Sequence, residues 1–472
     1  MISVQNHQQQ LNGNKMLKLK TTVKAIKLSL FRKHYSSFKL KNLKLSRLSP
    51  FHTNYSPLSI QIKPIYFLLL PFYFITACSP KTTPVNKQPE FPKVEQKVVV
   101  KEVPKQQEVP VQKAKDKSEM IVSLILPFEL SSIDYKTATL SDIRKAEIAI
   151  DFYQGFKMGL DSVAATKGAV NFKLQVFDSN DNPASLGTLA SKGAIKVSDL
   201  IVGPVFPNGV KAFSAYSKNM KKPMVSPLAA TDPETFNNPY LITVNNAIDQ
   251  HAFKAVTFIK TELKPKKVII IRSGQADEYK YAVPFKKGVD SLAKGMLLSE
   301  IGIKAIGYEN VYKYLNPTGL NVIVLPATDR VFLLTIFKEL EKLSRTFKIA
   351  VIGHPGWKKA AFLDFQQLEL LNTYITSSYK INYQTSQVLD FIKYYRSNFS
   401  VEPSEYAFKG FDIGYYFGLL MNEKEHDFMK AIGTSFNGIH NDFNFIQNSK
   451  YGYFNTSLMV MKYENSQLTK VN

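Results

Sequence analysis

The sequence predicts an α/β protein built from two doubly wound lobes with parallel sheets. From residue 120 onward, short and continuously apolar runs alternate with amphipathic helical segments. Apolar runs of this kind are typical of parallel strands that are buried on both faces by helices. The alternation occurs in two series of about equal size, which indicates two lobes.

The first series begins with a predicted strand at residues 121–126, which ends at Pro127. A helix is expected to start near Ser141 or Arg144, because apolar residues then recur at the spacing of one helix face. These residues are Ala149, Tyr153, Phe156, Leu160 and Val163. Further strands are predicted at residues 172–178, 200–202 and 224–225, with helices between them.

The second series contains predicted strands at residues 267–271, 321–325 and 347–352. The helix before the last of these strands carries an apolar stripe. Its residues are Leu333, Ile336, Phe337, Leu340 and Leu343. Residues 443–464 predict a β-hairpin whose turn lies near Asn448 and Gly452.

The net charge of +23 is concentrated at the N-terminus. Residues 1–78 hold 12 Lys or Arg and no acidic residue, and residues 79–118 hold nine basic and five acidic residues. The remaining 354 residues hold 40 basic and 33 acidic residues. A nucleic-acid-binding protein would carry its basic residues on the folded part. The distribution therefore predicts no nucleic-acid partner.

Cys78 is the only cysteine, and it ends an apolar run that follows Lys63. Residues 61–77 predict a signal peptide, and Ile75-Thr-Ala-Cys78 resembles the bacterial lipobox. This resemblance implies cleavage before Cys78 and lipidation of its thiol. The alternative is a transmembrane helix, but the run is shorter than the ~20 residues of a membrane span and contains Pro71.

Two further segments are predicted before the folded part. Residues 1–60 are basic and free of acidic residues, and we hypothesise that translation starts near Leu58 or Ile60, so that this extension is not made. An unusually long basic region of the signal peptide is the alternative. Residues 78–118 are rich in Pro, Lys, Gln and Val, which predicts an extended, disordered tether.

The motif search favours a protein that is not an enzyme and has no cofactor. The sequence has no Gly-x-Gly-x-x-Gly, no Walker-type loop and no Gly-x-Ser-x-Gly motif. With one cysteine, there is no internal disulfide and no multi-cysteine zinc site. Asp178 and Asp181 are compatible with a cation site, but a turn after a strand is the simpler interpretation, so no metal site is predicted.

Several short motifs occur in a fixed order along the chain. They are Leu124-Ile-Leu-Pro-Phe128, Phe152-Tyr-Gln-Gly-Phe156, Leu160-Asp161, Phe177-Asp178, Ile201-Val-Gly-Pro204, Pro223-Met-Val-Ser-Pro227, Phe391-x-x-Tyr-Tyr395, Pro403-Ser-Glu-Tyr-Ala407 and Gly410-Phe-Asp412. Each is weak alone, but their order and spacing are specific. Through them, about three-quarters of the chain resembles the type I periplasmic binding proteins. More closely, it resembles the branched-chain amino-acid (leucine-binding-protein-like) family, in the lipoprotein form seen in Bacteroidota.

The resemblance implies two lobes joined by three hinge crossovers, near Asn245, Ser378 and Thr434. Lobe 1 would comprise residues 119–245 plus 379–433, and lobe 2 would comprise residues 246–378 plus 434–472. It also implies a lipid-anchored protein in the periplasm of a Gram-negative bacterium, on the outer or inner membrane. Such a protein holds a small solute between its lobes for ABC-type uptake or sensing, with an ABC permease as partner.

The candidate ligand-binding residues lie in loops that follow the predicted strands, where open parallel sheets bind ligands. They are Phe206, Ser226, Ala230, Thr231, Tyr279, Thr328, His354 and Trp357. Tyr279 matches the family's aromatic residue that covers the solute. His354 beside Trp357 suggests stacking on a ligand, although a packed or solvated histidine is the simpler interpretation.

Two departures from the family pattern bear on the ligand. Phe206 stands where amino-acid binders have a hydroxyl, and Pro355 stands where they have an acid that pairs with the ligand ammonium. Loss of that acid would leave a desolvated charge unmatched. A more apolar or neutral ligand is therefore expected, or none. In the latter case the chain would act by protein contact, for example as an activator of peptidoglycan synthesis with a cell-wall synthesis protein as partner.

Overall fold

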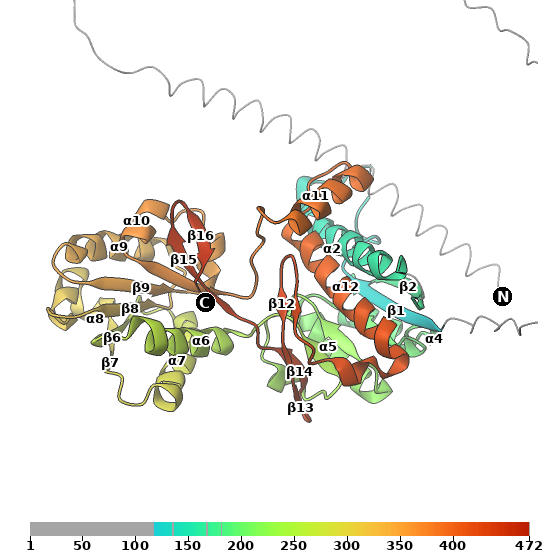
Figure 1. Cartoon of the computed structure of the whole chain (residues 1–472), viewed down its shortest axis with the longest axis horizontal. Coiled ribbons are helices and arrows are strands. Elements are labelled where there is room, and N and C mark those ends of the chain that lie inside the picture. The colour runs from blue at the N-terminus through green and yellow to red at the C-terminus, as the bar shows by residue number, and fades with distance from the viewer. Residues whose placement is uncertain (1–117, 135, 167–168, 181, 472) are drawn as a thin grey trace, which may run out of the picture. The chain divides into compact units, whose positions relative to one another are not determined.

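The computed structural model describes residues 118–471, apart from residues 135, 167–168 and 181. The predictions for the basic extension, the signal peptide, Cys78 and the tether up to residue 117 lie outside this described part. The described chain forms two seven-stranded sheets, each with helices on both faces (Figure 1). The predicted α/β, doubly wound fold class is thus confirmed. None of the described helices is both long and apolar enough to cross a membrane.

The first lobe contains a sheet with the strand order β13-β14-β5-β4-β3-β1-β2. The strands are β1 (Glu119–Leu126), β2 (Asn171–Asp178), β3 (Leu200–Val202), β4 (Met224–Ser226), β5 (Leu241–Thr243), β13 (Phe445–Asn448) and β14 (Gly452–Asn455). Neighbouring strands are parallel except β13, which is antiparallel to β14. Because β1 lies between β2 and β3, the loops after β1 and β3 flank the point where the strand order reverses.

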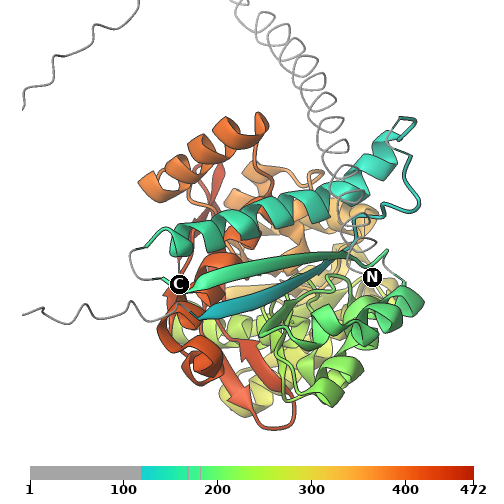
Figure 2. The same cartoon turned by 90° about the vertical axis from the view of Figure 1, so that its right-hand side faces the viewer.

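Helices cover both faces of this sheet. They are α2 (Leu140–Ala164), α3 (Pro183–Ser191), α4 (Gly193–Lys196), α5 (Pro207–Met220) and α12 (Glu405–Lys424). A further helix, α11 (Ser386–Phe399), packs against α2 and α12 rather than against the sheet. Side chains alternate along β1, so Val122 and Leu124 join the core beneath α2 and α12, whereas Ile125 joins the core beneath α3 and α5. Figure 2 shows the teal α2 running alongside β1 and β2.

The two long helices α2 and α12 pack with their backbones in contact. Gly155 and Gly159 of α2 face α12, and Gly410 and Gly414 of α12 face α2. A Cβ atom at Gly155 would lie 1.8 Å from the carbonyl oxygen of Ala407, and one at Gly410 would lie 2.2 Å from the carbonyl oxygen of Phe152. Glycine is therefore required on both helices for this close approach.

The second lobe contains a sheet with the strand order β16-β15-β10-β9-β8-β6-β7. The strands are β6 (Lys267–Arg272), β7 (Leu298–Gly302), β8 (Asn321–Leu325), β9 (Ile349–Gly353), β10 (Thr373–Ser377), β15 (Met459–Glu464) and β16 (Gln467–Lys470). Strands β6 to β10 are parallel to one another, whereas β15 is antiparallel to both β10 and β16.

The second sheet is also buried on both faces. Its helices are α6 (Ile248–Phe258), α7 (Tyr279–Leu292), α8 (Ile303–Ile306), α9 (Arg330–Ser344) and α10 (Phe365–Leu370). On β6, Val268 and Ile270 join the core with α6 and α7, whereas Ile269 and Ile271 join the core with α9. This alternation explains why β6 is apolar at four successive positions.

Three chain segments connect the two sheets. The chain leaves the first sheet after β5, returns after β10, and passes to the second sheet again between Asn455 of β14 and Met459 of β15. The prediction of the last crossover near Thr434 is therefore wrong, as is the assignment of residues 434–455 to lobe 2. The physical reason is that Phe443 and Phe445 pack against Tyr416 of α12 in the first core.

The predicted C-terminal hairpin is shorter than expected. β13 and β14 form an antiparallel pair around a turn that begins at Asn448 and ends at Gly452, as predicted. Residues 459–464 are not part of this hairpin, because they form β15 in the other sheet.

Candidate functional site

The loop after β3 brings the chain close to β1. Gly203 precedes Pro204 through a cis peptide bond and has a φ of +97°. A Cβ atom at Gly203 would lie 2.1 Å from the carbonyl oxygen of Ile125, so a side chain does not fit. Phe206 follows in the same loop, and its half-buried ring packs against the first core. Phe206 thus contributes to packing on this side of the sheet.

The loop after β4 carries a buried hydroxyl group without a partner. Ser226 is the last residue of β4 and is 1% exposed, and its Oγ has no hydrogen-bond partner among the described residues. Thr231 in the same loop is half-buried, and Ala230 is exposed. The loop is held by Asn245, whose Nδ2 donates to the carbonyl oxygen of Leu228 at 2.5 Å. Two of the predicted residues, Ala230 and Thr231, therefore lie in this loop, and Ser226 ends the strand before it.

Asp178 at the end of β2 acts as a turn former. Its carboxylate accepts hydrogen bonds from the backbone N–H groups of Phe128 (3.0 Å), Leu130 (2.7 Å) and Asn180 (2.9 Å), among others. These bonds support the interpretation as a turn, because the carboxylate oxygens are taken up by the backbone. Within the described part of the chain, no group of three or more His, Cys, Asp or Glu residues is arranged to hold a metal ion.

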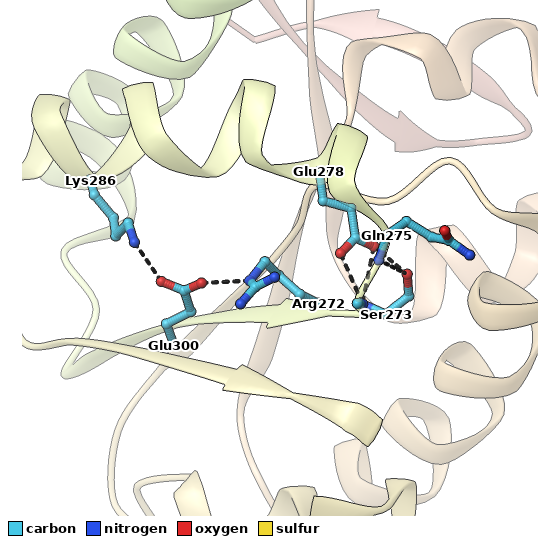
Figure 3. Close-up of polar contacts among 7 residues, drawn as sticks. Arg272, Ser273, Gln275, Glu278, Lys286 and Glu300 are labelled. Atoms are coloured by element: carbon cyan, nitrogen blue, oxygen red, sulfur yellow. Dashed lines mark hydrogen bonds and ion pairs between the residues drawn. The ribbon is translucent and has the colours of Figure 1, made fainter. Parts of the chain in front are cut away.

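In the second lobe, a buried carboxylate holds the loop after β6. Glu278 is 1% exposed and accepts hydrogen bonds from Ser273 Oγ (2.6 Å), Ser273 N (3.0 Å) and Gly274 N (3.2 Å) (Figure 3). Gly274 has a φ of +98°, which is unfavourable for a residue that has a side chain. The loop therefore turns tightly, and it places Tyr279 at the start of α7.

We expect Glu278→Ala to lower the free energy of unfolding by about 2 kcal/mol. The substitution would leave the N–H groups of Ser273 and Gly274 without their acceptor. Asp277→Ala is the matched control, because Asp277 is the exposed neighbouring acid and should change stability by less than about 0.5 kcal/mol. Urea unfolding of both variants measures the difference, and equal stabilities would contradict the role of Glu278.

Tyr279 presents one ring face to an arginine and is otherwise exposed. The guanidinium carbon of Arg272 lies 4.3 Å from the ring centroid, while 45% of Tyr279 remains exposed. Arg272 is fixed by Glu300 at 2.5 Å, and Glu300 also accepts from Lys286 at 2.7 Å (Figure 3). Burial would raise the pKa of Glu300, but the hydrogen bonds from Lys286 and Arg272 outweigh it and lower that pKa. The arrangement holds Tyr279 in a defined orientation.

The loops after β8 and β9 contain the remaining predicted residues. Thr328 follows β8 and is exposed, and His354 begins the 3₁₀ turn η5 (Pro355–Lys359). The Nδ1 atom of His354 accepts a hydrogen bond from Gly356 N at 3.0 Å, and burial lowers the pKa of His354 to about 4. The imidazole is therefore neutral at physiological pH and serves as the N-cap of this turn.

Trp357 lies in the core and is not placed to contact a solute. It is 2% exposed, its Nε1 donates to the carbonyl oxygen of Ala327 at 2.9 Å, and its ring packs edge-on against Phe337. The indole fills the space above Gly353, where a Cβ atom would lie 2.1 Å from it. Its predicted pairing with His354 on a ligand does not match this position.

Known proteins are similar to the chain in structure but not in sequence. No protein-family model and no curated protein sequence matches it. A Rhodospirillum rubrum protein described as a branched-chain amino acid ABC transporter matches with a TM-score of 0.57 and 13% identity, over 75% of this chain and 100% of its own. The chain has the type I periplasmic-binding fold.

A second solved structure has the same fold. It is a Desulfitobacterium hafniense ABC transporter substrate-binding protein in complex with Leu, with a TM-score of 0.51 and 12% identity. The match covers 75% of this chain and 100% of that protein's own chain.

Because β6, β8 and β9 are neighbours, the loops that carry Tyr279, Thr328 and His354 lie along one edge of the second sheet.

A polar group that the sequence analysis did not identify lies beside the crossovers that follow β5 and β10. Tyr379, just after β10, stacks on His440 with ring centroids 4.1 Å apart. The ammonium of Lys358 lies 3.3 Å from the centroid of the Tyr379 ring, and that of Lys409 lies 5.9 Å from it. Lys409 also donates a hydrogen bond to Asn245 Oδ1. We call these five residues, Asn245, Lys358, Tyr379, Lys409 and His440, the crossover cluster.

Burial has a large effect on the two lysines of the crossover cluster. It lowers the pKa of Lys358 and of Lys409 to about 7, although the nearby Glu405 favours their charged forms. One sequence signal was present for Lys409: residues 406–421 form an otherwise apolar helix in which Lys409 and Asp412 are the only charges. A charge in a helix that is apolar all around indicates a buried polar site.

A pocket of about 390 Å³ also lies at the carboxyl edge of the second sheet. It is lined by residues that follow β6, β7 and β8, among them Ser273, Lys304, Tyr308 and Asp329. Its position beside β6 corresponds to the point where the strand order of this sheet reverses. The eight predicted ligand-binding residues all lie in the described part of the chain, and none of them lines this pocket.

Proposed function

We propose that the chain is a lipid-anchored, periplasmic solute-binding protein without enzymatic activity. It holds a small solute between its lobes and serves ABC-type uptake or sensing. Support for solute binding comes from the type I fold. The chain shares this fold with one structure described as an ABC transporter substrate-binding protein and with one described as a branched-chain amino acid ABC transporter. The lipid anchor rests on Cys78 and the signal-peptide pattern before it.

The observation that carries this proposal is the hydroxyl group of Ser226. A buried hydroxyl normally has a hydrogen-bond partner, because leaving it unpaired costs about 1–3 kcal/mol. Ser226 Oγ has none among the described residues, and it lies at the carboxyl end of β4. In an open parallel sheet this is the edge where ligands bind. A solute that bonds to Ser226 would complete the site.

A thermal-shift screen of the full-length chain tests the proposal. The panel consists of amino acids, peptides, sugars and cell-wall fragments. A ligand at 100 times its dissociation constant adds about 2.7 kcal/mol of stability. We expect at least one compound to raise the melting temperature; a complete panel without a shift would contradict solute binding.

Tyr279→Ala is expected to abolish the shift that the wild type shows, because Tyr279 is the aromatic residue that covers the solute. Tyr312→Ala is the control: Tyr312 is 48% exposed, close to the 45% of Tyr279, and lies outside the loops after β6, β8 and β9. An unchanged shift in Tyr279→Ala would remove Tyr279 from the site.

A second function is supported by the packing of Phe206 and Trp357. The half-buried Phe206 packs against the first core and has no polar group. Trp357 lies in the second core with its Nε1 bonded to the carbonyl oxygen of Ala327, so neither side chain offers a polar contact to a solute. In this alternative, the fold binds no solute and acts through a protein partner, such as a component of peptidoglycan synthesis. This alternative would be favoured if no compound of the panel raised the melting temperature and a cell-wall synthesis protein co-purified with the chain.

A further inference from the structure

The ammonium group of Lys409 has fewer acceptors than it has N–H bonds. Lys409 lies in the first turns of α12 and is 4% exposed. A lysine ammonium has three N–H donors. Within the described part of the chain, Asn245 Oδ1 is the acceptor of one of them, and the other two have no protein acceptor.

The acidic groups around Lys409 are already engaged. Glu405 accepts hydrogen bonds from Lys359 Nζ (2.5 Å) and from Tyr379 Oη (2.6 Å). Both carboxylate oxygens of Asp412 are occupied by the backbone N–H groups of residues 439–441, at 2.7–3.0 Å. A buried cation without a carboxylate of its own is costly. The charge of Lys409 is therefore incompletely balanced by the protein.

The position of Lys409 links it to the predicted site. Asn245, which accepts its hydrogen bond, donates in turn to the carbonyl oxygen of Leu228 at 2.5 Å. Leu228 belongs to the same loop as Ser226 and Thr231. The second ammonium of the crossover cluster is not available in this way, because Lys358 donates to Tyr379 O (2.6 Å) and Ser377 Oγ (3.3 Å) and lies against the Tyr379 ring.

We propose that the solute carries a carboxylate that pairs with the ammonium of Lys409. This inference rests on the proposed solute-binding function and specifies its ligand class. One incompletely satisfied ammonium matches one negative charge, which favours a monoanionic carboxylate over a dianionic phosphate. The sequence alone predicted a more apolar or neutral ligand, or none, because Pro355 stands where amino-acid binders have an acid. Lys409 changes that expectation.

Matched pairs of compounds test the charge requirement on the full-length chain. The probes are isocaproate and isocaproamide, benzoate and benzamide, and propionate and propionamide, in which an amide replaces the carboxylate at nearly constant shape. We expect a carboxylate to bind at least about tenfold more tightly than its amide. In Lys409→Gln, which retains a donor for Asn245 but no charge, this preference should disappear. Lys424→Met, at the exposed end of the same helix, should retain it.

A second readout observes Lys409 directly. The protein is labelled with ¹³C at the lysine ε-carbons and observed by NMR. The signal that is present in the wild type and missing in Lys409→Gln belongs to Lys409. Addition of a carboxylate that binds in the first experiment should raise the pKa of the Lys409 ammonium by at least about one unit, because an adjacent anion stabilises the charged form. An unchanged pKa would mean that water, rather than a solute anion, satisfies its remaining N–H bonds, and would overturn the inference.

The outcomes separate this inference from the proposed function. If the amides bind as tightly as the carboxylates, or if the preference persists in Lys409→Gln, the carboxylate inference fails while solute binding stands. The carboxylate inference also fails, and solute binding also stands, if only uncharged compounds of the thermal-shift panel bind. If no compound of either set binds, the proposed function fails, and the inference fails with it.

Discussion

Gly155→Ala is expected to lower the free energy of unfolding by about 3 kcal/mol or more. The added Cβ atom would lie 1.8 Å from the carbonyl oxygen of Ala407, well inside the contact distance of any two atoms. Relief requires α2 and α12 to move apart. Both helices contribute to the first core, so the movement would also loosen the packing of Phe152 and Ile413.

Gly193→Ala provides the control for this experiment. Gly193 is also a helical glycine of the first lobe, but a Cβ atom there has no heavy atom within 4 Å. Because alanine is the better helix former, this variant should be as stable as the wild type or up to about 1 kcal/mol more stable. Equal urea midpoints for Gly155→Ala and Gly193→Ala would show that α2 and α12 leave room for a Cβ atom at position 155.

The α/β fold was predictable because its signals are local. Each buried strand carries its own apolar run, as β6 and β8 do, and α9 carries its own apolar stripe. The last crossover was not predictable in this way. Whether residues 443–455 join the first or the second sheet depends on contacts of Phe443 and Phe445 with Tyr416, which lies more than 25 residues earlier in the chain. Hydrophobic periodicity identifies a strand but not the sheet it joins.

For the candidate site, the loops could be predicted from the sequence, but the directions of the side chains in them could not. Loops at strand ends follow from the strands themselves, so the positions of Ser226, Tyr279 and Thr328 were accessible from the sequence. The direction of a side chain in such a loop depends on its turn. Trp357 turns inward because η5 aims its Nε1 at the carbonyl oxygen of Ala327. Tertiary contacts of this kind also bring Lys409 to the crossovers, far from the loops in sequence.

Lys409→Met is expected to stabilise the protein at pH 6, by about 1–4 kcal/mol. The pKa of Lys409 is lowered from 10.5 to about 7 in the folded chain, chiefly by burial. Between these two values the unfolded chain binds a proton that the folded chain does not, so wild-type stability rises with pH across this window. Below pH 7 both states are charged, and the folded state bears the full cost of the buried ammonium. Methionine fills a similar volume without that cost, although Asn245 Oδ1 loses its donor.

The stabilisation should therefore depend on pH in a defined direction. It is largest below pH 7 and decreases between pH 7 and 10.5, by up to about 1.4 kcal/mol per pH unit. Urea unfolding of the wild type and Lys409→Met at pH 6 and pH 9 measures this change. Lys424→Met should show no such pH dependence, because Lys424 is exposed and paired with Glu423. A Lys409→Met variant that is less stable than the wild type at pH 6 would mean that the ammonium is already compensated within the protein. In that case the free energy that a solute carboxylate gains by pairing with Lys409 would be small.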